Sequence, residues 1–203
     1  MATMILPASE LKRLVRRRRA AGGCLDEVWD GVYVMVPDPD NEHQELGTHL
    51  AHALIASLSP LRGIRIAQNF NISDLSKRWI RNHRKPDLSV FLPGNPAENR
   101  KTHWLGGPDL AIEIVSHKDR SRQKFDFYAA VGVRELLIVD RDPWLLELHR
   151  LGPEGWRIAG TSTLDRPDPI ELETIGLSCR LVPGPERPQV ELRSADRLAA
   201  WLA

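Results

Sequence analysis

The chain has 203 residues, and its 28 Lys and Arg against 27 Asp and Glu give a net charge of only +1 at pH 7. This balance excludes a strongly basic or strongly acidic protein, so a charged partner would have to meet a local cluster of charges. No stretch of the sequence reaches the ~18 consecutive apolar residues that a membrane-spanning helix needs, and we expect no membrane insertion.

Residues 1–203 are expected to form a single domain, because no Gly-, Ser- or Pro-rich linker divides them. A helix is predicted over residues 8–21, and its basic residues Lys12, Arg13 and Arg16–Arg19 are interpreted as a solvated face, with nucleic-acid binding as the alternative. The segment lacks the apolar core of a secretory signal. With only two cysteines in the chain, this favours a reduced, cytoplasmic location.

A β-hairpin is predicted over residues 24–36, because Asp30-Gly31 lies between two strand-like runs. A helix is expected next, over Glu42–Leu58, where leucines recur at helical spacing. Its histidines, His43, His49 and His52, form no HExxH motif, and leucines occupy the core face between them. A histidine-ligated zinc site is therefore not favoured.

The sequence from residue 63 to residue 92 predicts two strands separated by a basic segment. Gly63–Ile72 alternates like a strand, and a second strand follows Pro86-Asp87, so that Asp87 lies at the start of that strand. The basic segment between them contains Lys77, Arg78, Arg81, Arg84 and Lys85 around Trp79. Basic residues with an aromatic among them can contact phosphates and stack on a base, although a solvated surface is equally compatible.

Residues 108–140 predict a strand, a helix and a second strand, at Leu110–Val115, Asp119–Val131 and Arg134–Asp140. Before them, residues 93–107 are rich in Pro, Gly and Asn and are expected to form a long loop that borders the substrate or lies on the surface. Gly132 is the expected end of the helix.

Two charged residues in this unit lie where apolar residues are expected. Glu113 lies between two isoleucines, where an ionised carboxylate is unfavourable without a partner. Lys124 shares the helical stripe of Phe127, Tyr128 and Val131, which predicts that its side chain points into the core. A structural ion pair and a catalytic pair are both compatible with this pattern.

A second acid favours the catalytic interpretation of Glu113 and Lys124. Asp87 lies at the start of an apolar strand that precedes them in the sequence. Two carboxylates suit Mg²⁺, which binds through one or two carboxylates together with water and phosphate oxygens. A lysine beside them can orient a metal-bound water or stabilise charge on a phosphate. The order Asp87, Glu113, Lys124 therefore predicts a metal-dependent phosphoryl site.

The C-terminal part is predicted to be mostly strand. Residues 144–150 and 156–159 form an expected hairpin, and Ile175–Leu181 is the expected last strand or edge. Ala195–Leu202 is an expected short helix, and Trp201 at its end suits an intermolecular or a terminal packing contact. No nucleotide-binding glycine motif is present.

Several of these features, taken in order, resemble the Uma-type family of restriction-endonuclease-like proteins, within the PD-(D/E)XK nuclease superfamily. The resemblance spans about residues 25–182, and the matching residues are Glu27, Gly31, His43, Asp87, Glu113, Lys124, Tyr128, Gly132, Val133 and Asp140. The superfamily lysine normally lies two positions after the acid, where this chain has Val115. The family supplies it from the following helix, which corresponds to Lys124, with Lys118 as a weaker candidate.

The resemblance implies an α/β (mixed α+β) fold with a restriction-endonuclease-like core, in which helices flank a central mixed sheet preceded by an N-terminal helix and hairpin. It implies a metal-dependent DNA endonuclease that uses Mg²⁺, with Mn²⁺ as a substitute, and acts as a homodimer. Asp87, Glu113 and Lys124 would be catalytic, and Glu27 would join Asp87 and Glu113 as a metal ligand. The expected substrate-binding residues are His43, Arg84, Lys85 and Tyr128.

Two alternatives remain open at the level of sequence. One is a non-catalytic protein that keeps the nuclease fold and binds nucleic acid or a partner. The other is an unrelated protein in which Glu113 and Lys124 form a structural ion pair. An exposed hairpin position is also compatible with Glu27.

Overall fold

A computed structural model describes residues 25–115, 119–194 and 199–203, with a few scattered positions before residue 24. The expected helix over residues 8–21 and its basic cluster, as well as Cys24 and Lys118, lie outside the continuously described segments. None of the described helices is both long enough and apolar enough to span a membrane.

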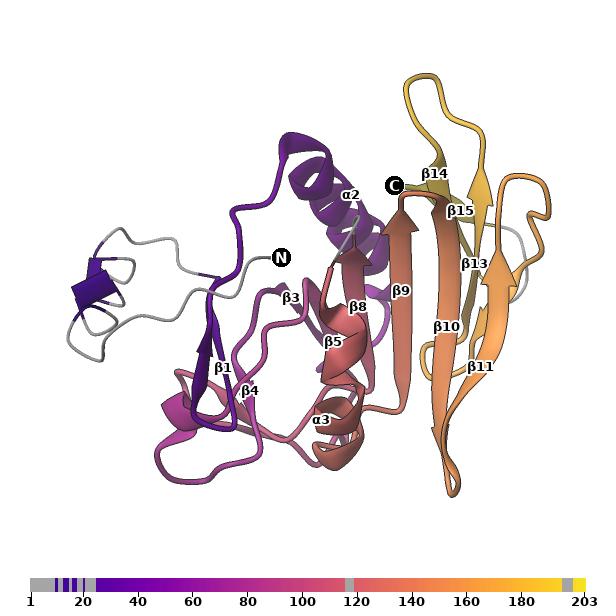
Figure 1. Cartoon of the computed structure of the whole chain (residues 1–203). Helices are drawn as coiled ribbons and strands as arrows, with labels where there is room; N and C mark the ends of the chain where they lie inside the picture. The colour runs from indigo at the N-terminus through magenta and orange to yellow at the C-terminus, as the bar shows by residue number, and fades with distance from the viewer. Residues whose placement is uncertain are drawn as a thin grey trace.

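A six-stranded mixed sheet forms the centre of the fold (Figure 1). Its spatial order is β11 (Gly155–Ser162), β10 (Trp144–Gly152), β9 (Glu135–Arg141), β8 (Leu110–Val115), β5 (Leu88–Phe91) and β3 (Arg65–Gln68). Only β8 and β9 are parallel, and every other neighbouring pair is antiparallel. The expected central mixed sheet with helices against it is confirmed.

The two faces of the sheet carry separate hydrophobic cores, and the alternation along β8 explains why. Leu110, Ile112 and Ile114 point to the face covered by α2 (Asn41–Leu58). Ala111 and Val115 point to the opposite face, with the residues of α3 (Phe125–Ala130). Glu113 shares this second face, because side chains two apart on a strand lie on the same side.

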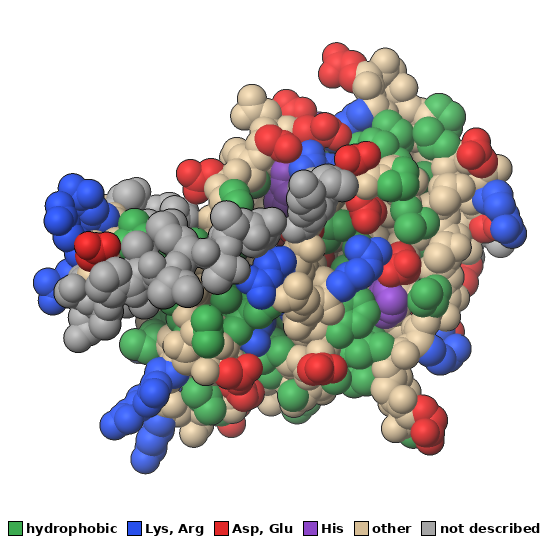
Figure 2. Space-filling view, viewed as in Figure 1, with side chains coloured by type: hydrophobic (Ala, Val, Ile, Leu, Met, Phe, Trp, Pro, Cys, Tyr) green, Lys and Arg blue, Asp and Glu red, His purple; other side chains and the backbone are tan. Residues whose placement is uncertain are grey.

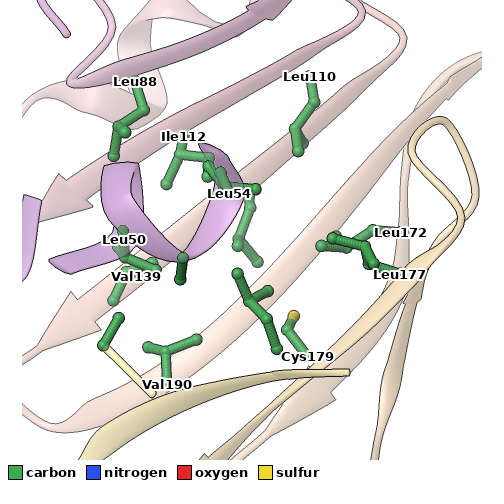
Figure 3. Packing of buried hydrophobic residues seen from close by; sticks show 14 of the residues in the cluster. Leu50, Leu54, Leu88, Leu110, Ile112, Val139, Leu172, Leu177, Cys179 and Val190 are labelled. Carbon is green, nitrogen blue, oxygen red and sulfur yellow. The ribbon is translucent and has the colours of Figure 1, made fainter. Parts of the chain in front are cut away.

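A second, four-stranded antiparallel sheet completes the core on the α2 side. Its order is β12 (Ile170–Leu172), β13 (Leu177–Val182), β14 (Gln189–Ser194) and β15 (Ala200–Leu202). Figure 3 shows Leu50 and Leu54 of α2 among side chains from both sheets, including Val139 and Val190. The hairpin turned near residues 152–155 is confirmed, and a strand, β13, lies within the region predicted from residue 175 to residue 181. It is neither the last strand nor an edge, because it lies between β12 and β14 in the sheet, and β14 and β15 follow it in the chain.

The expected helix over residues 195–202 is wrong for residues 200–202, which pair with β14 as strand β15. Residues 195–198 lie outside the described residues. Trp201 packs against the main hydrophobic core within the chain, which agrees with a terminal packing contact.

Two small sheets lie beside the central one. The hairpin of β1 (Glu27–Trp29) and β2 (Val32–Val34) turns at Asp30-Gly31, as expected. A three-stranded sheet contains β4 (Ile72–Ser73), β7 (Trp104–Leu105) and β6 (Glu98–Asn99). The expected continuous strand over residues 63–72 is therefore broken into β3 and β4, and the expected loop over residues 93–107 contains two short strands.

The crossover from β8 to β9 is shorter than the helix predicted over residues 119–131. Its described helical part consists of the 3₁₀ turn η2 (Ser121–Lys124) followed by α3. Elsewhere in the chain, a further 3₁₀ turn, η1 (Trp79–Arg81), lies in the basic segment. Gly132 ends the crossover with a φ of +84°, a conformation that glycine adopts without strain. Lys124 is thus the last residue of η2, directly before α3.

Candidate active site

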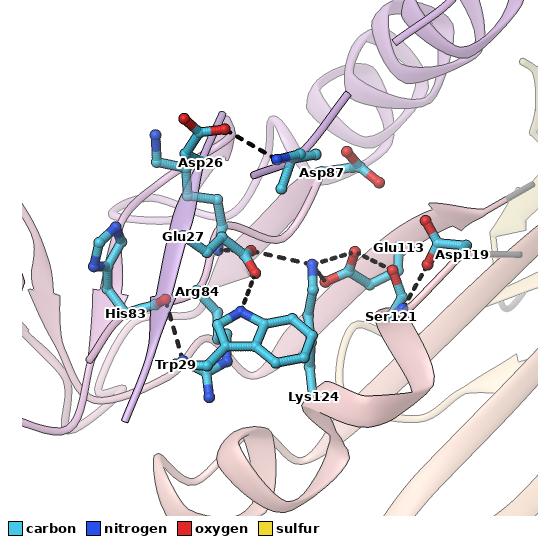
Figure 4. Close-up of polar contacts among 12 residues, drawn as sticks. Asp26, Glu27, Trp29, His83, Arg84, Asp87, Glu113, Asp119, Ser121 and Lys124 are labelled. Atoms are coloured by element: carbon cyan, nitrogen blue, oxygen red, sulfur yellow. Dashed lines mark hydrogen bonds and ion pairs between the residues drawn. The ribbon is translucent and has the colours of Figure 1, made fainter. Parts of the chain in front are cut away.

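A buried lysine lies between two buried carboxylates, and we call Glu27, Glu113 and Lys124 the Glu-Lys-Glu cluster. Lys124 Nζ lies 3.0 and 3.1 Å from the two carboxylate oxygens of Glu113 and 3.1 Å from Oε1 of Glu27 (Figure 4). Glu27 is 1%, Glu113 2% and Lys124 8% exposed. The hairpin, the central sheet and the crossover each contribute one residue, so the cluster joins three parts of the fold.

Glu113 is held by three side-chain donors. Besides Lys124, Ser121 Oγ donates to Oε2 of Glu113 at 3.0 Å, and the buried Tyr128 hydroxyl donates to Oε1. Burial, together with the nearby carboxylates of Asp87 and Glu27, raises the pKa of Glu113 to about 7 against the opposing effect of Lys124. Glu113 can therefore release or accept a proton close to neutral pH.

Glu27 is fixed by the loop that leads into β5. The backbone N–H of Lys85 donates to Oε1 of Glu27 at 2.7 Å, and Trp29 Nε1 donates to Oε2 at 2.6 Å. Burial alone would lower the pKa of Lys124, but the charges of Glu113 and Glu27 raise it above its usual value. Lys124 therefore stays positively charged between the two carboxylates.

Asp87 lies directly beside β8. Its Oδ2 accepts a hydrogen bond from the backbone N–H of Ile114 at 2.7 Å, and its Oδ1 lies 3.4 Å from Nε2 of His43. His43 is near the start of α2, where Asp40 caps the helix by accepting from the His43 N–H at 2.8 Å. Burial lowers the pKa of His43, but the hydrogen bond and charge of Asp87 outweigh this and raise it.

The cluster and Asp87 meet at one pocket with a volume of about 230 Å³. Acids and bases from several parts of the fold line its wall: Glu27, His43, Lys85, Asp87, Glu113, Asp119, Lys124 and Arg141. Arg141, at the end of β9, binds both carboxylate oxygens of Asp40 at 2.9 and 3.2 Å. The pocket thus combines carboxylates with fixed positive charges, an arrangement that can bind a cation and a phosphate together.

A family model named Uma2 and described as "Putative restriction endonuclease" matches residues 25–182. The chain belongs to the Uma2 family. The matched region contains every residue of the pocket wall, so the pocket lies within the part of the chain that defines the family.

The Uma2 chain also shares its fold with a solved structure from Anabaena variabilis, titled as a "putative nuclease belonging to DUF820". The two sequences are 20% identical, the match covers 79% of this chain and 81% of the other, and the TM-score is 0.56. At this identity the likeness describes the fold, which is the expected restriction-endonuclease-like core. No curated protein matches the sequence.

Most of the residues singled out from the Uma2 sequence are brought together by the fold. Asp87, Glu113, Lys124, Glu27 and His43 all line the pocket. Tyr128 lies behind it, fully buried, and reaches it only through its bond to Glu113. Lys85 lines the pocket wall.

Arg84 was expected to bind substrate, but the structure buries it away from the pocket wall. It is 4% exposed, and its guanidinium lies 4.8 Å from the ring centroid of Trp29 and 4.4 Å from that of Phe127. It donates to the backbone carbonyl of Val28 at 2.9 Å. Arg84 therefore joins the hairpin to α3, and a charged side chain between two aromatic rings fulfils a structural role.

Ser121 and Arg141 are polar pocket residues of this Uma2 protein that were not expected from the sequence. Ser121 supports Glu113, and Arg141 places a guanidinium on the pocket wall. Arg141 directly follows the matched Asp140, and this position at the end of a strand was the only signal in the sequence. Serine before a helix is usually read as a cap, so its bond to Glu113 could not be anticipated.

Within residues 25–115, 119–194 and 199–203, no group of three or more His, Cys, Asp or Glu side chains is arranged to hold a metal ion by itself. In particular, His49 and His52 form no such group with Glu45. The candidate ligands Asp87 and Glu113 supply two carboxylates, and the third negative charge, Glu27, is bound to Lys124.

Proposed function

We propose that this Uma2 protein is a metal-dependent endonuclease that hydrolyses phosphodiester bonds in DNA at the pocket of Asp87, Glu113 and Lys124. The observation that carries the proposal is the buried ammonium of Lys124, 3.0 Å from Glu113, on a pocket that Asp87 also lines. Ionisable groups in a pocket whose pKa values are shifted by burial and by charged neighbours, as those of Glu113 and Lys124 are, are typical of functional sites. The family description and the shared fold support the same activity.

The donor set fits Mg²⁺, or Mn²⁺ as a substitute. Mg²⁺ binds through one or two carboxylates and keeps several waters that phosphate oxygens can replace. Asp87 and Glu113 offer these carboxylates, and the carbonyl oxygen of Ile114 is a further candidate, because Ile114 lies on the same pocket. When bound, such an ion would act as a Lewis acid and lower the pKa of a coordinated water.

The residues around the candidate metal ligands divide the remaining tasks. Lys124 holds a permanent positive charge, which would stabilise negative charge that develops on the scissile phosphate. His43, bonded to Asp87, orients that carboxylate and can hold a proton at Nε2. Lys85 and Arg141 add positive charge to the wall, where they would orient phosphate oxygens.

Glu27 has two proposed roles. It fixes Lys124 in the structure, and it would serve as an additional metal ligand if Lys124 turned toward the phosphate. We also propose that residues 1–203 form one nuclease domain and that two chains act together, because one active site per chain suits the cleavage of two strands by a homodimer.

Cleavage of supercoiled plasmid and labelled oligonucleotides, with Mg²⁺, with Mn²⁺ and with chelator, tests the proposal. The wild type should cut only with metal, and Asp87→Ala should lower the rate by about 10²-fold or more, by analogy with the loss of one transition-state contact. Asp126→Ala is the matched control, since Asp126 is an exposed acid on α3. Equal activity of wild type and Asp87→Ala at every metal concentration would falsify the assignment.

The alternative is a non-catalytic protein that binds nucleic acid and keeps the fold. It is favoured by one observation, namely that the carboxylates of Glu27 and Glu113 are already paired with Lys124. Titration calorimetry with Mn²⁺ separates the two functions. Metal binding by the wild type that is lost in Asp87→Ala supports the nuclease, whereas DNA binding without any metal binding supports the alternative.

A further inference from the structure

A second pocket, with a volume of about 370 Å³, continues from the candidate active site. The two pockets share Asp87, His43 and Asn69 as wall residues, so they form one groove with Asp87 in the middle. The first turns of α2 and the end of β3 line the second part. We call this second part the amide groove, after its residues Gln44, Gln68 and Asn69.

The two parts of the groove differ in charge. Lys85, Lys124 and Arg141 line the first pocket, whereas no described wall residue of the amide groove is Lys or Arg. The charged groups of the amide groove are the carboxylates of Asp38 and Asp87, together with His43 when it is protonated. The first pocket also carries carboxylates, but its basic groups, together with the metal ion of the proposed function, suit a phosphate, whereas the amide groove suits an uncharged ligand with hydrogen-bonding edges.

The amide groups of this groove are available for a ligand. Neither the Gln68 nor the Asn69 side chain has a hydrogen-bond partner among the residues that the structure describes. Gln44 donates from Nε2 to the carbonyl of Pro39 at 3.1 Å, which leaves its amide oxygen as an acceptor. The groove thus presents paired donors and acceptors beside the proposed catalytic Asp87.

Backbone features keep these amides in place. Asn69 has a φ of +56°, and its N–H points at the carbonyl oxygens of Pro86 and Asp87, each at 3.2 Å. The absence of a side chain at Gly47 leaves room for Gln68, since a Cβ at Gly47 would lie 3.1 Å from Gln68 Nε2. The position of the amides is therefore tied directly to the segment that carries Asp87, just before β5.

We propose that the amide groove binds the nucleobase next to the scissile phosphate and favours adenine, an inference that rests on the proposed nuclease function. A planar amide can donate to one atom of an adenine edge while it accepts from the neighbouring one, and Asn and Gln are the side chains that pair with adenine in this way. The phosphate lies in the first pocket, and the adjoining base enters the amide groove. Discrimination against the other bases is about 5- to 150-fold, the range for one bidentate contact.

The test uses oligonucleotides that differ only in the base beside the cut, measured by cleavage with Mg²⁺ and, separately, by binding affinity without metal. The wild type should prefer adenine, and Gln68→Ala should remove that preference while it changes the average over the four bases much less. Gly47→Ala should weaken the preference through Gln68. Gln189→Ala, an amide removed on β14 outside both pockets, should leave the preference unchanged.

Equal rates and affinities of the wild type for all four bases overturn the inference, as does a full adenine preference in Gln68→Ala. Base-dependent binding without cleavage supports the amide groove and counts against the nuclease activity. A protein that binds none of the oligonucleotides overturns both.

Discussion

Replacing Lys124 by Met should destabilise the protein in a way that depends on pH. The variant keeps most of the side-chain volume but removes the positive charge from between Glu27 and Glu113, which are 1% and 2% exposed. Breaking a buried ion pair by removing one partner costs about 3–5 kcal/mol. We expect a loss of this size near pH 8, where Glu113 of the wild type is ionised.

The pH dependence follows from the pKa of Glu113. Because burial raises that pKa from 4.5 to about 7, the folded wild type binds a proton that the unfolded chain has lost, and stability falls as pH rises through this window. Without Lys124 the pKa rises further, so the window extends above neutral pH. The difference between the two proteins should therefore grow above pH ~7 by up to about 1.4 kcal/mol per pH unit, and it should be smaller near pH 6.

Urea unfolding followed by circular dichroism, at several pH values between about 6 and 9, measures this difference. Adding Glu113→Gln to the Lys124→Met variant should remove most of its pH dependence, since no buried carboxylate then remains to be ionised on β8. The same loss of stability at every pH, or no loss near pH 8, would show that Lys124 does not neutralise Glu113 in solution.

Three further outcomes follow from buried groups elsewhere in the fold. His83 is 5% exposed, and burial lowers its pKa from 6.5 to about 4, so at this residue the unfolded chain alone takes up a proton as pH falls through this window. This group by itself should lower the stability by about 3 kcal/mol between pH ~6.5 and ~4, opposite to the contribution of Glu113, so urea unfolding should show His83→Gln gaining about this much stability relative to the wild type over that range. Glu135 accepts from Arg150 at 2.9 Å and from Thr174 Oγ1 at 2.6 Å, so Glu135→Gln should cost about 3 kcal/mol in the same assay without changing the metal dependence of cleavage. Gly107→Ala would place a Cβ 2.8 Å from a side-chain carbon of Val133 and should cost about 1–3 kcal/mol by overpacking, whereas Gly152→Ala, with its nearest contact at 3.8 Å, should leave the thermal midpoint almost unchanged.

The central part of the site was predictable because its residues contradict their surroundings. Glu113 interrupts an apolar strand and Lys124 lies on an apolar helical stripe, and both features are visible without a structure. The fold brings them within 3.0 Å, although Lys124 lies in a 3₁₀ turn rather than inside the expected long helix. The apolar residues next to Glu113 and Lys124 were enough to predict the direction of each side chain. The prediction that they meet did not depend on the exact length of the helix.

Other features depend on contacts between distant segments, which local patterns do not encode. Arg84 belongs to a basic segment, and only the approach of Trp29 and Phe127 explains why it is buried. Residues 200–202 look helical by spacing, but pairing with β14 places them in a strand. The strands β6 and β7 have two residues each, too few for a periodic pattern to appear.

The Glu-Lys-Glu cluster has a consequence for how this protein reaches its active form. Glu27 and Lys124 are far apart in the sequence, and their contact also requires the loop at Lys85, whose N–H binds Glu27. Closing such long stretches of chain is slow compared with forming local turns. A partly folded or newly synthesised chain would therefore lack the assembled charges, and the proposed phosphodiester cleavage would begin only after the hairpin has docked.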